Sequence, residues 1–272
     1  MRTLITLFCL LPFYAIANVN VVTSINPIHQ ITSTIMQGAG KPELLIKQQV
    51  SAHHFSFRPS HFTLIKNADL MIWIGSDFES GFQRLPDIMR KSTRQLELMK
   101  ALGLKNKDGH IWYSPDLLPM IVDHISAALS DIDPTNKPLY QSNSKSLIDS
   151  IQTWADATNA TITKAKPRYI LDHDFLSHFE KDMGIKATAV LHDGHDQHSG
   201  IHELKTIEAA LHESPVKCLL MNEPTASKLA KNFAAEFGLK IHNITLTSDN
   251  EQQSSGLIDS LNRLTSIMQE CH

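Results

Sequence analysis

The stretch TNKPLYQSNSKSLIDSIQTWADATNATITKAK, residues 135–166, separates two halves of the sequence that show the same alternation of strand and helix patterns. It contains no glycine, and its apolar residues recur at helical spacing, with Thr158 as an interruption. Pro134 and Pro138 stand at its start and Pro167 follows its end, as is typical of helix boundaries. The stretch predicts one long helix, about 45 Å if it is unbroken from Lys137 to Lys166.

Short β-rich runs alternate with amphipathic helical patterns on both sides of this helix. The expected strands are residues 19–25, 42–48, 68–75 and 96–102, then 168–174, 185–191, 216–222 and 240–246. The clearest helical patterns are residues 29–40, 201–214, 227–238 and 256–270. Such alternation predicts parallel sheets covered by helices on both faces. We expect an α/β fold with two similar domains, each a roughly four-stranded parallel sheet flanked by helices, joined by the long rigid helix.

The expected domain bounds follow from these patterns and from an N-terminal leader. Arg2 precedes an apolar run, and Ala15-Ile16-Ala17 is typical of a signal-peptide cleavage site. The run is shorter than the roughly 20 residues that a membrane-spanning helix needs, and an uncleaved anchor is the alternative. We therefore expect a signal peptide (1–17), an N-terminal α/β domain (18–134), the linking helix (135–166) and a C-terminal α/β domain (167–272). The mature chain would then be periplasmic.

The net charge argues against one class of partner, and the cysteine content predicts a disulfide. The formal net charge is −3 and no basic patch is present, so nucleic acid is not an expected partner. Cys9 lies in the leader, which leaves Cys218 and Cys271 as an even pair in an exported chain. The pair predicts a disulfide, worth roughly 4 kcal/mol for a loop of about 53 residues, with two free thiols as the alternative.

Three of the 15 histidines are candidate metal ligands. His53 follows the second expected strand, His110 opens a helical stretch and His173 ends the fifth expected strand. Ligands of parallel sheets bind outside the carboxyl ends of the strands, and three imidazoles leave one tetrahedral position of Zn²⁺ open. Spacing alone leaves a solvated or capping role as the alternative for each.

Five ordered motifs carry a resemblance to a known family. They are VVTSINPIHQITSTI (21–35), HHFSFRPSHFTLIKNADLMIWIG (53–75), HIWYSP (110–115), HDFLSHFEKDMGI (173–185) and LLMNEPTAS (219–227). With these motifs the chain resembles the cluster A-I solute-binding family of bacterial ABC importers, which bind zinc or manganese, and most closely its zinc-uptake branch. The resemblance covers nearly the whole mature chain and implies the fold described above, with metal held between the domains.

The resemblance implies His53, His110 and His173 as metal ligands and pairs Cys218 with Cys271. A third imidazole favours Zn²⁺ over Mn²⁺, which prefers oxygen ligands.

The fourth metal ligand is less well defined by the resemblance. Thr247 stands where many members have a ligating Asp, so Asp249 or water is the expected fourth ligand. Glu223 is expected to be structural or to support a ligand, while Asp172 and Asp174 either support ligands or cap the strand end.

A histidine-rich stretch, HDGHDQHSGIH (192–202), lies outside these motifs. Its glycines argue against a continuous helix and favour a loop. One hypothesis is that the loop captures zinc or delivers it to the main site through its four histidines. The alternative is a solvated surface loop. The four histidines are His192, His195, His198 and His202.

The predicted function is that of a periplasmic receptor, not an enzyme, that binds Zn²⁺ in an interdomain cleft as cargo. Its expected partners are an inner-membrane ABC permease and its ATPase, and the receptor itself is expected to be a monomer. Metal affinity should fall as the pH drops through about 6.5, because imidazole binds metal in its neutral form. The alternatives are a receptor for manganese or another divalent metal, an adhesin, and an exported zinc hydrolase, although the sequence has no His-Glu-x-x-His motif.

Overall fold

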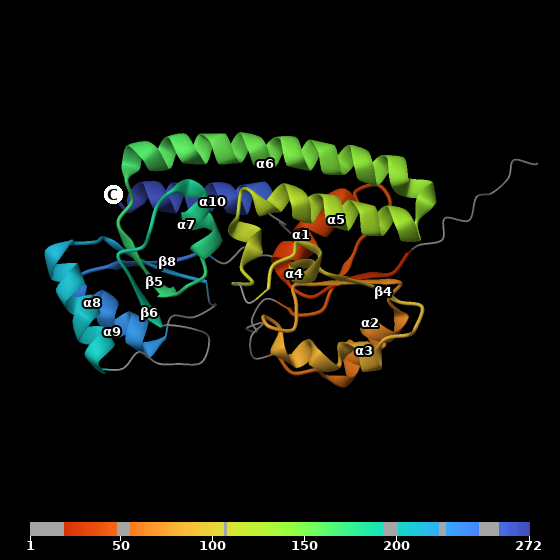
Figure 1. Cartoon of the computed structure of the whole chain (residues 1–272), viewed down its shortest axis with the longest axis horizontal. Helices are drawn as coiled ribbons and strands as arrows, with labels where there is room; N and C mark the ends of the chain where they lie inside the picture. Colours follow the sequence, from red (N-terminus) through yellow and green to blue (C-terminus); the bar gives the residue numbers. More distant parts are fainter. Residues whose placement is uncertain (1–18, 48–54, 106–107, 193–200, 223–226, 245–255) are drawn as a thin grey trace, which may run out of the picture.

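Two four-stranded parallel sheets, one in each half of the chain, form the frame of the described residues (Figure 1). The computed structural model describes residues 19–47, 55–105, 108–192, 201–222, 227–244 and 256–272. The fold class expected from the sequence is confirmed. Within the described residues no helix is both long enough and apolar enough to cross a bilayer.

The first sheet has the strand order β2-β1-β3-β4. Its strands are β1 (Val21–Thr23), β2 (Glu43–Leu44), β3 (Leu70–Trp73) and β4 (Arg94–Glu97). The helices of this half are α1 (Asn26–Ile35), α2 (Pro59–Asn67), α3 (Leu85–Ile88), α4 (Leu98–Ala101) and α5 (Leu117–Ile132). Short 3-10 helices are η1 (Ser80–Arg84), η2 (Ile111–Tyr113) and η3 (Pro134–Asn136).

The expected strand at 96–102 is wrong in its position. β4 ends at Glu97, and the next four residues form the helical turn α4. Leu98 and Met99 are consecutive and both buried. A strand would direct two consecutive side chains to opposite faces, whereas a helical turn lets both contact the same core.

The second sheet has the same topology, with the strand order β6-β5-β7-β8. Its strands are β5 (Tyr169–His173), β6 (Ala189–His192), β7 (Cys218–Met221) and β8 (Lys240–Asn243). Its helices are α7 (Ser177–Met183), α8 (Ile201–Glu213), α9 (Lys228–Phe237) and α10 (Leu257–Glu270). β6 starts four residues later than the expected strand at 185–191, because Gly184 ends α7 in a left-handed conformation and residues 185–188 connect it to the strand.

The predicted long helix is present as α6 (Lys137–Ala165), which runs across both halves of the molecule (Figure 1). Its end is marked by Lys166, which adopts a left-handed conformation with φ 49° immediately before Pro167. Thr158, which interrupts the apolar stripe, is fully buried, and its hydroxyl lies 2.7 Å from that of Thr265 in α10. The indole of Trp154 donates a hydrogen bond to the same Thr265 hydroxyl at 3.0 Å. The interruption is therefore a polar contact between α6 and α10.

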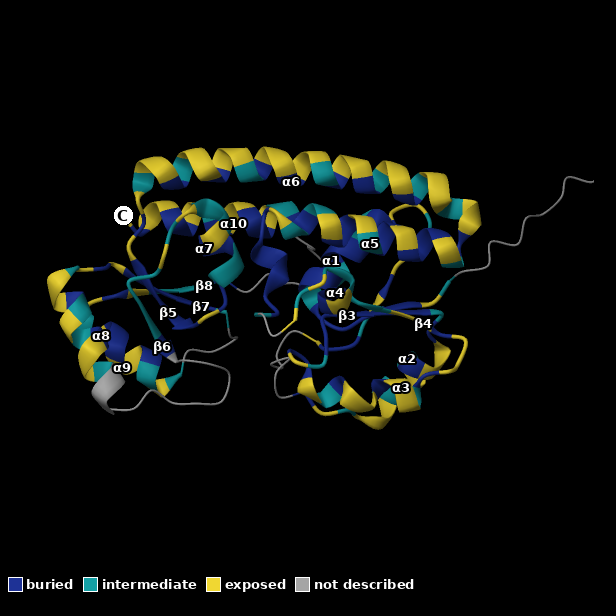
Figure 2. Ribbon diagram, in the orientation of Figure 1, coloured by how far each residue is buried: buried dark blue, intermediate teal, exposed yellow. Residues whose placement is uncertain are grey.

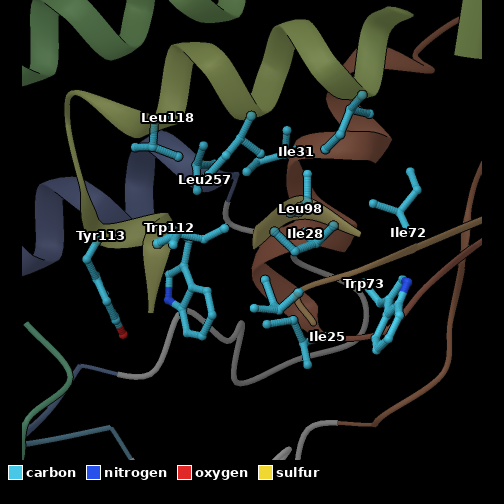
Figure 3. Close-up of a cluster of buried hydrophobic side chains, with 14 of the residues drawn as sticks. Ile25, Ile28, Ile31, Ile72, Trp73, Leu98, Trp112, Tyr113, Leu118 and Leu257 are labelled. Carbon is cyan, nitrogen blue, oxygen red and sulfur yellow. The ribbon is translucent and has the colours of Figure 1, made fainter. Parts of the chain in front are cut away.

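A single apolar core extends beneath α6 from the first sheet to the second, while α8 and α9 cover a separate cluster on the far face of the second sheet (Figure 2). Leu257 from α10 belongs to this shared core together with Leu118 and Ile31 of the first half (Figure 3). Successive side chains of strand β7 point to opposite faces of the sheet, so β7 contributes residues to both clusters. Cys218 and Leu220 face the shared core, whereas Leu219 and Met221 face α8 and α9.

The predicted disulfide is present and joins β7 to the residue that follows α10. The Cα atoms of Cys218 and Cys271 are 5.5 Å apart, and both residues are buried. The cross-link therefore fixes α10 to the second sheet at one end, in addition to its packing along α6.

Candidate metal site

His110 lies immediately before η2, and its ring is held by Asp108. The carboxylate Oδ1 of Asp108 is 2.6 Å from Nδ1 of His110 and accepts the His110 backbone N–H at 3.1 Å. A carboxylate at this distance favours the tautomer that carries its proton on Nδ1. Nε2 then keeps its lone pair and is the ring atom able to bind a metal ion.

The electrostatic environment keeps Asp108 ionised. Burial alone would raise the pKa of its carboxyl, but the adjacent His110 and the hydrogen bonds from His110 and Ser177 hold the pKa well below its usual range. The Ser177 hydroxyl donates to Oδ2 of Asp108 at 2.9 Å, and Nε2 of His178 lies 2.7 Å from the Asp108 carbonyl oxygen. Asp108, a residue of the first half, thus orients His110 and also contacts the start of α7 in the second half.

His173 reaches the same place from the second sheet. It is the last residue of β5 and is 8% exposed, whereas His110 is 1% exposed. The ring centroids of His110 and His173 are 5.4 Å apart, and the ring of Phe175 lies 5.2 Å from His173. Two buried imidazoles, one from each half, are therefore neighbours.

Aromatic rings enclose His110 on its other sides. Phe78 and Trp112 contact its ring edge-to-face, with centroid distances of 5.0 and 5.2 Å. The preceding Gly109 permits this packing, because a Cβ atom at that position would lie 2.4 Å from a ring carbon of Phe78. The apolar surroundings fix the ring and exclude water from it.

Further hydrogen bonds cross between the halves next to this site. The Tyr113 hydroxyl lies 2.9 Å from Oδ1 of Asn222 and 2.8 Å from the carbonyl oxygen of Ile244. The Ser114 hydroxyl donates to the carboxylate of Asp182 in α7. Since Tyr113 and Ser114 directly follow the His110 segment, these bonds hold that segment against the second half.

The structure brings together two of the predicted metal ligands, His110 and His173. Asp172, predicted to support a ligand, has Oδ2 3.9 Å from Nδ1 of His173, whereas Asp174 is exposed. In the histidine-rich stretch, the backbone of His192 pairs with His173 at the end of β6. His202 is in the first turn of α8. The remaining predicted residues lie outside the described part of the chain; they are His53, Glu223, His195, His198, Thr247 and Asp249.

Sequence reasoning missed Asp108 and Tyr113. For Asp108 a local signal exists, because the order Asp-Gly-His places a carboxylate two residues before a candidate ligand, where it can reach Nδ1. Tyr113 has no comparable local signal, since its partners lie 109 and 131 residues away.

Comparisons with known proteins identify the family and the fold of the chain. A family model described as the periplasmic component A of the zinc-uptake complex matches residues 21–271. The high-affinity zinc uptake system protein ZnuA of Bacillus subtilis is 26% identical over 262 residues, covering 88% of this chain and 82% of that protein. The crystal structure of the metal-dependent lipoprotein YcdH from Bacillus subtilis has a TM-score of 0.78 at 26% identity, covering 93% of this chain and 98% of that one.

One further solved structure shows the same fold with a bound metal. Zn(II)-bound AdcA from Streptococcus pneumoniae has a TM-score of 0.77 at 19% identity. The match covers 93% of this chain and 57% of AdcA, so this chain corresponds to about half of that protein.

Proposed function

The chain belongs to the family of periplasmic zinc-uptake component A proteins, and from this membership we propose that it is a receptor that binds Zn²⁺ and delivers it to an ABC importer. Zinc is the cargo in this proposal and not a resident cofactor. The protein acts by binding and release, without catalysis, in the periplasm.

The observation that carries the proposal is the juxtaposition of His110 and His173. In a tetrahedral complex with Zn–N distances of about 2.0–2.1 Å, two imidazole ring centres lie about 5 Å apart when both rings point at one ion. The observed centroid distance is 5.4 Å, so the two rings need little movement to share a metal. Asp108 supports this role by directing Nε2 of His110 away from its own carboxylate.

We propose His53 as the third ligand, with Asp249 or water as the fourth. Three imidazoles form a nitrogen-rich ligand set, which favours Zn²⁺ over Mn²⁺. The ligands come from both halves of the chain, so the bound ion lies in a cleft between the proposed domains 18–134 and 167–272, with the long helix between them. The mature chain after removal of residues 1–17 is the proposed monomeric form, and its partners are the membrane permease and the ATPase of the importer.

The test is a calorimetric titration of zinc into the wild-type protein and a His110→Ala/His173→Ala variant. A His124→Ala variant is the matched control, because His124 lies in α5 outside the proposed ligand set. We expect one tight zinc in the wild type and the control, and none in the double variant. Wild-type zinc binding in the double variant would overturn the proposed site.

A parallel titration with Mn²⁺ separates the two candidate cargoes. We expect Mn²⁺ to bind much more weakly than Zn²⁺ to the wild-type protein, because imidazole ligands suit the softer ion. Tighter binding of Mn²⁺ would identify the protein as a manganese receptor of the same family.

The histidine-rich loop has a separate test. We propose that His192, His195, His198 and His202 capture zinc or pass it to the main site. A variant with all four replaced should then load zinc more slowly or bind fewer equivalents than the wild type. Unchanged stoichiometry and loading rate would leave the loop as a solvated surface segment.

A further inference from the structure

A second group of side chains of the types that bind metal ions lies around the disulfide, at the edge of the second sheet. Cys218 in β7 and His242 in β8 project from the same face, because Cys218 pairs with Lys240 and side chains two residues apart share a face. Cys271, which follows α10, lies against this face. One ligand atom from each of Cys218, His242 and Cys271 lies within 4.8 Å of the other two.

These distances are close to those of a tetrahedral zinc site. With Zn–S distances of about 2.3 Å, two thiolate sulfurs on one zinc are about 3.8 Å apart. The sulfurs of Cys218 and Cys271 are covalently joined, so the disulfide must open before an ion can enter. The imidazole lies within 4.8 Å of both sulfurs already, so the backbone that carries these residues can stay in place.

His242 also has the environment of a ligand. Its side chain is 10% exposed, and Nε2 forms no hydrogen bond with any residue in the part of the chain that the structure describes. The nearest charged oxygen is Oε2 of Glu270, 3.9 Å from Nε2. A buried imidazole nitrogen without a hydrogen bond is costly unless it binds something.

We propose that reduction of the Cys218–Cys271 disulfide creates a second metal site, in which both thiolates, the His242 imidazole and the Glu270 carboxylate bind Zn²⁺. Two sulfur ligands and one nitrogen are a typical ligand set for zinc, and they differ chemically from the histidines of the main site. The inference does not rest on the proposed receptor function.

The chemistry requires a reductant and releases protons. A dithiol transfers two electrons and two protons to the disulfide, which yields two protein thiols and the oxidised cyclic form of the dithiol. Zinc then displaces the two thiol protons and binds the thiolates. Glu270 must release Lys240, whose Nζ is 2.6 Å from Oε2.

Access to the buried sulfurs comes from the end of α10. The helix ends at Glu270, directly before Cys271, so local opening of its last turn is the expected route to the sulfurs. This opening must also break the hydrogen bond from the Arg168 N–H to the Cys271 carbonyl oxygen at 2.6 Å.

The experiment compares Co²⁺ binding to the oxidised protein and to protein reduced with a dithiol and then freed of it without oxygen. Thiolate ligation to Co²⁺ produces a charge-transfer absorption in the near ultraviolet that histidine and carboxylate ligands do not produce. We expect this band, with one additional equivalent of Co²⁺, only in the reduced protein. Because the band reports thiolates alone, it can be read whether or not the main site binds metal.

Two variants test the residues of the site. His242→Ala keeps both cysteines and should weaken the additional binding by about 10-fold or more. His212→Ala, an exposed position in α8, is the matched control and should bind like the wild type. The proposal is overturned if reduction produces no thiolate band, if His242→Ala binds as tightly as the wild type, or if circular dichroism shows that reduction unfolds the protein.

Discussion

Replacing Glu79 with glutamine should remove a large part of the pH dependence of stability. Glu79 follows β3 and is fully buried, and its Oε2 accepts the backbone N–H groups of Ile74 at 2.8 Å and Gly75 at 3.2 Å. Burial raises the pKa of its carboxyl to about 7, although these hydrogen bonds act in the opposite direction. The nearby Glu97 raises the pKa further by charge repulsion.

The sign and size of the effect follow from linkage. An unfolded chain releases the Glu79 proton near pH 4.5, whereas the folded protein holds it to about pH 7. The stabilisation that the folded protein gains from holding the Glu79 proton is therefore fully present below pH 4.5 and is lost as the pH rises through 7. Over this interval the free energy of unfolding falls by roughly 3 kcal/mol, at 1.36 kcal/mol per pH unit. Glutamine is neutral throughout and still presents an oxygen to the two N–H groups.

The assay is urea-induced unfolding of the wild type and Glu79→Gln at about pH 4.5 and about pH 8. Between about pH 4.5 and about pH 8, the free energy of unfolding should fall by roughly 3 kcal/mol less in the variant than in the wild type. Glu213→Gln, at the exposed end of α8, is the control and should behave like the wild type. If Glu79→Gln shows the wild-type difference, the buried carboxyl is not the group responsible and the reasoning fails.

Three further predictions concern the metal site and the disulfide. Asp108→Asn should lower zinc affinity by about 10- to 100-fold while leaving the circular dichroism spectrum unchanged, because the His110 ring loses its carboxylate partner. Gly109→Ala should weaken zinc binding and lower the free energy of unfolding by about 1–3 kcal/mol, because its Cβ meets the Phe78 ring. Gly256→Ala, whose Cβ has no neighbour within 4 Å, should leave zinc affinity unchanged. Reduction of the disulfide without added metal should lower the free energy of unfolding by about 4 kcal/mol, as measured in urea with and without reductant.

The fold was predictable because its signals are local. Alternation of apolar runs and helical patterns gave two parallel sheets, and prolines at both ends bounded α6. The error at β4 arose where consecutive apolar residues fit a strand and a helix equally well. Only the core that Leu98 and Met99 contact decides between the two.

The candidate site was predictable only in part. Motif order identified His110 and His173, and the structure brings them together, while His53 and Asp249 stay predictions. The supporting contacts depend on residues far apart in the chain, such as Asp108 with Ser177, 69 positions later. A local pattern carries no information about such a pair. The buried Thr158 hydroxyl is a similar case, because its partner in α10 lies 107 residues away.

The packing of α10 has a consequence for the order in which the chain acquires its structure. α10 contacts α1 as well as α6, although more than 200 residues separate α10 from α1 in the sequence. Leu257 of α10 and Ile31 of α1 are buried in the same core, so the first half lacks part of its interior until α10 has been synthesised (Figure 3). Such distant contacts slow folding. A ribosome-bound chain that lacks α10 should therefore remain incompletely folded in both halves, and completion of the first half is a late event.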